Sequence, residues 1–298
     1  MKSLIVKQMS IFLIVMTFII RQNLFAVNSV NTNGLEITFI SNCGFLIKAG
    51  DKKILLDLED PEKSFYKTEL LEAYNLMYNN KAPFDDVNLL LISHPHADHL
   101  GAKEVTKYLS ENSKVKMYST VDVLDEIKKK DLNLFNQIKN NIETVNPFDG
   151  KIIEKEIDGI KIEFLGTYHA GAPNYVLKDL CFIIHFGETK IFYMSDIDPG
   201  YENNLEAIRQ WSSKKEKIDL LFAPDVVLYL NEWSSQKGID AIKNFIKPKK
   251  IIATHLNPKA IEESKLKVRE NFLDVNFFDK SMEKIIFQPK DFQLESSK

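Results

Sequence analysis

Six consecutive positions hold an unusual density of metal-ligand side chains. They read His94-Pro95-His96-Ala97-Asp98-His99 and contain three of the six histidines in the chain. Buried polar groups must find partners, so a sheet edge has no structural need for such a run. Imidazole nitrogens and carboxylate oxygens are, in contrast, the ligands that Zn²⁺ takes in catalytic sites. The run therefore predicts a metal site to which one short loop contributes several ligands.

Four further polar residues each follow an apolar segment. They are Asp57, His169, Asp196 and His255. An α/β scaffold places its chemistry at strand ends, where the loops gather, so we expect these residues to join the run. His185 instead lies in the middle of an apolar segment, and we expect it to be an ordinary histidine of the core or of a sheet edge.

The segments that must position these residues alternate between strand and helix patterns. Strands are expected at 35–40, 44–49, 53–57, 87–93, 114–118, 151–157, 160–165, 175–186, 190–194, 218–222, 249–254 and 283–288. Helices are expected at 64–80, 101–110, 121–141 with a break near Asp131, 203–211, 235–246 and 258–271. This order favours an α/β fold with two β sheets packed face to face and helices on both outer sides. No linker-like stretch divides residues 27–298, which we expect to form a single domain.

The ordered series of ligand residues resembles that of the metallo-β-lactamase superfamily of metal-dependent hydrolases. The resemblance covers about residues 35–256 and implies a four-layer αββα sandwich with two mixed sheets. Within the superfamily, the segment from Phe39 to Asp57 resembles the branch of ascorbate-6-phosphate lactonases, which also contains phospholipase D enzymes that act on N-acyl phosphatidylethanolamines. Members of that branch usually carry a histidine where this chain has Asn42, so the substrate class stays open.

The resemblance also implies a role for each residue. His94, His96 and His169 would hold a first metal ion. Asp98, His99 and His255 would hold a second, and Asp196 would bridge the two. Asp57 would orient one of the ligands without binding a metal ion itself, and Asp98 would also orient the attacking hydroxide.

The chemistry of a two-metal site explains this set of residues. Two divalent cations about 3.5–4 Å apart lower the pKa of a bridging water towards 7, and the resulting hydroxide attacks a carbonyl or phosphorus centre. A structural zinc site is disfavoured, since such sites rarely lack cysteine. In di-iron, oxygen-reducing members of the superfamily a glutamate replaces the second histidine of the run, so His96 favours a hydrolytic site. Zinc is expected first, and manganese or iron are the alternatives.

The first 26 residues have the pattern of a secretory signal peptide. Lys2 and Lys7 precede an apolar run from Met9 to Ile20, and Ala26 stands at a plausible cleavage point. The run is shorter than the ~20 residues that a spanning helix needs, although an uncleaved anchor is the alternative. Loss of residues 1–26 would move the net charge from −3 to −6. A mildly acidic, secreted or periplasmic chain is a poor candidate for nucleic-acid binding, and we expect a small-molecule substrate.

Several features leave alternatives open. Cys43 and Cys181 could form a disulfide in an oxidising compartment, or remain two buried thiols. Residues 65–78 are expected to be helix core, with a substrate-facing lid as the alternative, and Tyr168 and Trp233 are candidates for the pocket wall.

The leading functional hypothesis is an exported dinuclear hydrolase of a small ester, lactone, amide or phosphodiester. The alternatives are an iron-dependent oxidoreductase on the same fold and a metal-bound protein without catalysis. A true β-lactam hydrolase is not favoured, because those enzymes often have cysteine at the position of Asp196.

Overall fold

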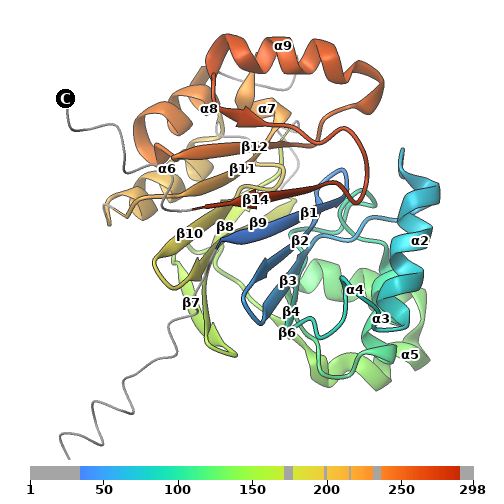
Figure 1. Cartoon of the computed structure of the whole chain (residues 1–298). Helices are drawn as coiled ribbons and strands as arrows, with labels where there is room; N and C mark the ends of the chain where they lie inside the picture. The colour runs from blue at the N-terminus through green and yellow to red at the C-terminus, as the bar shows by residue number, and fades with distance from the viewer. Residues whose placement is uncertain (1–33, 171–176, 198–199, 215, 231–235, 289–298) are drawn as a thin grey trace, which may run out of the picture.

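Two seven-stranded mixed sheets form the centre of the computed structural model, which describes residues 34–170, 177–197, 200–214, 216–230 and 236–288 (Figure 1). The first sheet has the order β14-β1-β2-β3-β4-β5-β6 and the second the order β13-β12-β11-β10-β9-β8-β7. The first contains β1 Leu35–Ser41, β2 Gly44–Ala49, β3 Lys52–Leu56, β4 Leu89–Leu91, β5 Lys116–Ser119, β6 Ile142–Thr144 and β14 Lys284–Phe287. The second contains β7 Ile153–Ile157, β8 Ile160–Tyr168, β9 Lys178–Phe186, β10 Thr189–Tyr193, β11 Leu220–Pro224, β12 Lys250–Thr254 and β13 Val275–Asn276.

Helices cover the outer face of each sheet (Figure 1). The first sheet carries α2 Lys67–Tyr78, α3 Ala102–Glu111, α4 Val121–Lys130 and α5 Leu132–Ile138. The second carries α6 Glu202–Ser212, α7 Asp225–Leu228, α8 Gln236–Ala241 and α9 Ile261–Asn271. Single turns of 3₁₀-helix occur at Lys139–Asn141 and Pro258–Ala260, and a π-helical segment at Ile242–Ile246 continues α8.

Three apolar clusters fill the three interfaces between the four layers. The cluster between the sheets includes Phe45 and Phe222, whose ring centroids lie 4.8 Å apart. A second cluster packs the first sheet against α2 to α5, and a third packs the other sheet against its own helices around the buried Trp211. The predicted four-layer αββα sandwich is confirmed.

Most predicted elements are present, and the differences have local causes. The helical stretch 121–141 breaks at Asp131, whose side chain caps α5 by accepting a hydrogen bond from the Leu134 amide at 2.9 Å. Strands β6 and β13 and helix α7 are two to four residues long, too short to produce a periodic pattern. The predicted signal peptide lies outside the described residues. Within the described part of the chain, no helix has both the length and the apolar character needed to span a membrane.

Strand direction brings the carboxyl ends of several strands to one edge of the sandwich. Strands β3 and β4 run parallel in the first sheet, as do β10, β11 and β12 in the second. Strand β8 is antiparallel to β9, which is antiparallel to β10, so β8 has the same direction as β10. The residues that follow these strands therefore meet at this edge.

Candidate metal centre

The run at 94–99 forms a compact turn at the end of β4. The amides of His99 and Leu100 both donate to the His96 carbonyl, at 2.9 and 2.7 Å. The turn is held against the end of β3, because the Leu58 amide donates to the His99 carbonyl at 2.9 Å. One tight turn thus presents four potential ligands from a fixed backbone.

Three histidines form the first ligand group. They are His94, His96 and His169, and their ligand nitrogens lie within 4.8 Å of one another. The ring centroids of His96 and His169 are 4.5 Å apart, and His94 lies 4.8 Å from each. His169 comes from the end of β8, so the structure brings together residues from both sheets.

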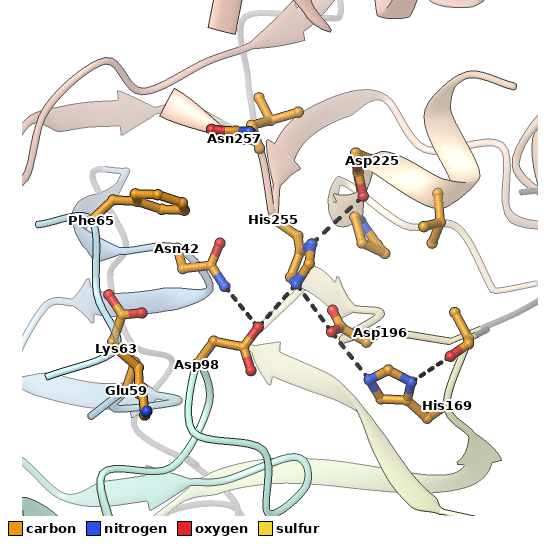
Figure 2. Close-up of a pocket in the computed structure, with 14 residues that line it drawn as sticks. Asn42, Glu59, Lys63, Phe65, Asp98, His169, Asp196, Asp225, His255 and Asn257 are labelled. Atoms are coloured by element: carbon orange, nitrogen blue, oxygen red, sulfur yellow. Dashed lines mark hydrogen bonds and ion pairs between the residues drawn. The ribbon is translucent and has the colours of Figure 1, made fainter. Parts of the chain in front are cut away.

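Four residues form the second ligand group, directly beside the first. They are Asp98, His99, Asp196 and His255. Asp196 Oδ2 lies 3.1 Å from His99 Nε2 and 3.3 Å from His255 Nε2. The same oxygen is 3.4 Å from Nε2 of His169, which belongs to the first group. Asp196 therefore sits between the two groups, as Figure 2 shows.

Carboxylates and a carbonyl behind the site fix the orientation of the imidazole rings. Asp57 Oδ2 lies 2.7 Å from His99 Nδ1, and the Ala170 carbonyl accepts a hydrogen bond from His169 Nδ1 at 2.6 Å. Nδ1 of His94 is 3.4 Å from Asp179, and Nδ1 of His255 is 3.6 Å from Asp225. Because Nδ1 of His99 and of His169 is hydrogen-bonded in this way, Nε2 of each ring is left to face the centre, which is the tautomer that metal ligation needs.

Asp57 is completely buried and serves as the hub of this support. Its two oxygens accept hydrogen bonds from the Ser93 amide and the Ser93 hydroxyl, both at 2.8 Å. Tyr193 of the opposite sheet donates its hydroxyl to Asp57 at 2.5 Å. Asp57 thus orients His99, as predicted, and its hydrogen bond from Tyr193 also links the two sheets directly.

Asp179 and Asp225 are supporting residues that the sequence prediction missed. Asp225 follows β11 directly, in the same strand-end position as His255 after β12, so that position was a usable signal. Asp179 lies near the start of β9, and its Oδ2 accepts a hydrogen bond from the Asp196 amide at 3.0 Å. Nothing in its local sequence distinguishes it.

The donor set fits metal ions. Nε2 of His94 and Oδ1 of Asp196 are buried, yet neither has a hydrogen-bond partner among the residues that the structure describes. An unpartnered buried polar atom is costly unless something outside the chain satisfies it. Histidine nitrogens and carboxylate oxygens at these mutual distances are suited to a divalent transition-metal ion.

The electrostatics of the two groups differ. Burial and the neighbouring His94 and His169 lower the pKa of His96 to about 4, which leaves its imidazole neutral and able to ligate. In the second group burial opposes ionisation, but His255 and His99 hold the pKa of Asp196 well below its usual value. Asp196 in turn outweighs burial and raises the pKa of both His99 and His255. The second group therefore favours positive charge at its centre, which a metal ion would supply in place of protons.

Three strand ends in the site have a left-handed backbone. The φ angles are +39° at Asp57, +53° at Ser195 and +57° at His255. Non-glycine residues adopt this region rarely, at a cost of about 1–3 kcal/mol each, and they do so mainly at functional sites. The surrounding hydrogen bonds hold these residues in place.

A cavity of about 550 Å³ opens above the two groups. Asn42, Glu59, Lys63 and Phe65 line one side, and residues after β11 and β12 line the other (Figure 2). Asn42 donates a hydrogen bond to Asp98 at 3.4 Å, so the residue that departs from the lactonase-like pattern does face the cavity.

The remaining sequence expectations have mixed outcomes. Helix α2 buries Leu70, Tyr74 and Met77 and is part of the core as expected, while Phe65 before it lines the cavity. Trp233 lies outside the described residues. Tyr168 packs against Tyr201, at a centroid distance of 5.6 Å, and is not among the described residues that line the cavity.

The two cysteines and His185 lie apart from the ligand groups. Cys43 and Cys181 are buried free thiols in different apolar clusters, which excludes the disulfide in this structure. His185 pairs with the buried Glu163 at 2.8 Å. Glu216 lies near enough to make a third group of potential ligands, but Lys214 and Lys190 already neutralise the two glutamates.

Comparisons with known proteins agree with this architecture. A family model described as beta-lactamase superfamily domain matches residues 36–255. A "UPF0173 metal-dependent hydrolase" of Pyrococcus horikoshii is 29% identical over 168 residues, which are 53% of this chain and 63% of that protein, so the match spans less than two thirds of this relative. The metallo-beta-lactamase fold protein YhfI of Bacillus subtilis has a TM-score of 0.59 at 17% identity, covering 85% of this chain and 99% of that chain. CmlA, a diiron β-hydroxylase from Streptomyces venezuelae, has a TM-score of 0.58 at 11% identity, covering 86% of this chain and 54% of that chain, which shows a shared fold alone.

Proposed function

Because the chain belongs to the beta-lactamase superfamily and carries two adjoining groups of metal-ligand residues, we propose that it is a dinuclear hydrolase, and the signal-peptide pattern of residues 1–26 favours its export. The proposal depends most on Asp196, whose Oδ2 lies 3.1–3.4 Å from histidines of both groups. A carboxylate in that position is what a shared ligand between two metal ions requires. The name of the Pyrococcus relative supports a metal-dependent hydrolase.

The residues have separate tasks in this proposal. His94, His96 and His169 would hold one ion, Asp98, His99 and His255 the other, with Asp196 between them. Two such ions would supply a nucleophilic water at neutral pH and stabilise the developing oxyanion. Asp98, held in place by His255 at 3.1 Å and by Asn42, would orient the attacking hydroxide.

The metal and the substrate class are the finer parts of the proposal. Zinc is favoured, because five imidazoles and two carboxylates suit it and because His96 supplies an imidazole at the second position of the run. The cavity volume suits a small ester, lactone, amide or phosphodiester.

Elemental analysis combined with a hydrolysis panel tests this proposal. We expect two zinc ions per chain and turnover of at least one substrate among a 4-nitrophenyl ester, bis(4-nitrophenyl) phosphate and a γ-lactone. His96→Ala should reduce the metal content to one ion and abolish turnover while circular dichroism stays unchanged, since His96 is partly exposed. Two iron ions per chain with a visible absorption band would favour the oxidoreductase alternative. No detectable hydrolysis of any substrate in the panel would favour a binding protein without catalysis.

His185→Ala is the matched control. It removes a histidine that pairs with Glu163, away from both ligand groups. This variant should keep two metal ions and the wild-type rate. Loss of one ion would contradict the assignment of the ligands.

A further inference from the structure

A lysine and an aromatic ring line the mouth of the cavity, and a second lysine contacts that ring. Lys63 and Phe65 line the cavity on the loop between β3 and α2 (Figure 2). Lys259 lies in the 3₁₀ turn Pro258–Ala260 that follows β12, with its Nζ 5.2 Å from the centroid of the Phe65 ring. Loops from the two sheets thus meet above the metal centre at a cation–π contact.

Phe65 is exposed where an aromatic residue would ordinarily be buried. Its side chain is 60% exposed. The next residue, Tyr66, packs inward at a centroid distance of 5.4 Å from Phe39, in an edge-to-face arrangement. Because Tyr66 already provides the contact with the core, the Phe65 ring stays exposed to a molecule entering the cavity, although Lys259 also contacts it.

The two lysines have no anionic partner in the part of the chain that the structure describes. Many other lysines of this chain do, such as Lys53, which lies 2.7 Å from Asp85, and Lys67, which lies 2.6 Å from Glu62. No described carboxylate lies within 4.0 Å of the amino group of Lys63 or Lys259, and both residues are exposed. Their charges are therefore available to a ligand.

The acidic side chains of the same cavity are already engaged. Asp98, Asp196 and Asp225 all lie within ion-pair distance of His255. Glu59 accepts a hydrogen bond from the Ser64 hydroxyl and is almost completely buried. The uncommitted charge at the mouth is consequently positive.

We propose that Lys63, Lys259 and Phe65 recognise a substrate in which a negatively charged group adjoins a flat aromatic group. The lysines would hold the anion and Phe65 would stack on the ring, while the bond to be cleaved lies over the ligand groups. This inference rests on the proposed function and adds to it the chemical class of the substrate.

Equilibrium binding tests the inference independently of turnover. Calorimetry on the zinc-loaded full chain would use three matched probes: phenylphosphonate, phenylacetate and the neutral phenylacetamide. The variants are K63Q/K259Q, Phe65→Ala and the control Lys128→Gln, whose lysine is exposed on α4. The double variant should weaken anion binding about 3- to 10-fold relative to the amide, as expected for two solvent-exposed ion pairs, and added salt should reduce the difference. Phe65→Ala should weaken all three probes, and Lys128→Gln none.

The outcomes separate the two sources of negative charge. A loss confined to phenylphosphonate supports a phosphoester substrate, and a loss for both anions supports anions of either kind. Equal loss for all probes in K63Q/K259Q, or no loss in that variant, would overturn the inference. Failure of the hydrolysis panel with lysine-dependent binding intact would refute the hydrolase and not this recognition site.

Discussion

Replacing Asp57 by asparagine tests whether the residues behind the ligands control the metal centre. Oδ2 of Asp57 accepts hydrogen bonds from the Ser93 hydroxyl, the Tyr193 hydroxyl and His99 Nδ1, while Oδ1 accepts from the Ser93 amide. An asparagine must turn its NH₂ group toward one of these two sets of donors. The NH₂ group then faces another donor, either the Ser93 amide or Nδ1 of His99. That buried donor loses its acceptor, at a cost of about 1–3 kcal/mol.

The loss should appear at the second ligand group. If His99 loses its acceptor, its proton moves to Nε2 and blocks ligation there. Removal of such a supporting partner typically weakens metal affinity 10- to 100-fold, or about 1.4–2.7 kcal/mol. Zinc titration of the chelator-treated protein against a competing indicator should therefore show one weakened site and one site near wild type. The exposed Asp149, replaced by asparagine, is the matched control.

Two unchanged zinc affinities in Asp57→Asn, together with an unchanged Tm, would refute this reasoning. They would mean that the ligands hold their orientation without the carboxylate. Weakening of both sites to the same extent would instead indicate a general loss of stability rather than a specific effect on His99.

Three further predictions concern stability and processing. Burial raises the pKa of Glu163, but hydrogen bonds from His185 and Lys214 outweigh it and lower the pKa to about 2. The stabilisation is therefore complete above the unfolded-state pKa near 4.5 and is lost as pH falls towards 2. Glu163→Gln should lower the free energy of unfolding at pH 7 by about 1–3 kcal/mol and weaken the dependence of Tm on pH between 4.5 and 2. An unchanged pH dependence of Tm in this range would contradict the prediction. Chelation should lower Tm. Zinc at 100 times its Kd should restore Tm, because binding at that concentration adds about 2.7 kcal/mol to the free energy of unfolding. A Tm that does not respond to zinc would argue against binding to the native state. Bacterial expression of the full chain should yield an exported protein that begins at Val27, and an intact mass that retains residues 1–26 would rule out cleavage.

The ligand residues could be predicted from sequence because each has a local signal. The run at 94–99 is conspicuous by composition, and Asp196 and His255 each follow a recognisable apolar strand. The structure brings all seven predicted residues into two adjoining groups. The layering could be predicted for the same reason, since the order of strands and helices is a property of the chain itself.

The supporting contacts could not be predicted, because they depend on how the two sheets are placed against each other. Tyr193 reaches Asp57 across 136 positions of sequence, and no periodicity sets that register. Lys259 and Phe65 meet in the same way, from loops of different sheets. Such contacts follow from packing, which local pattern does not encode.

The pairing of β14 with β1 has a consequence for how the chain acquires its structure during synthesis. Leu35 at the start of the first strand lies opposite Phe287 near the end of the chain. Until residues 284–287 leave the ribosome, β1 has an unpaired edge, and such edges invite pairing with other chains. The first sheet is therefore completed last, after the strands that supply His169, Asp196 and His255 have all been made.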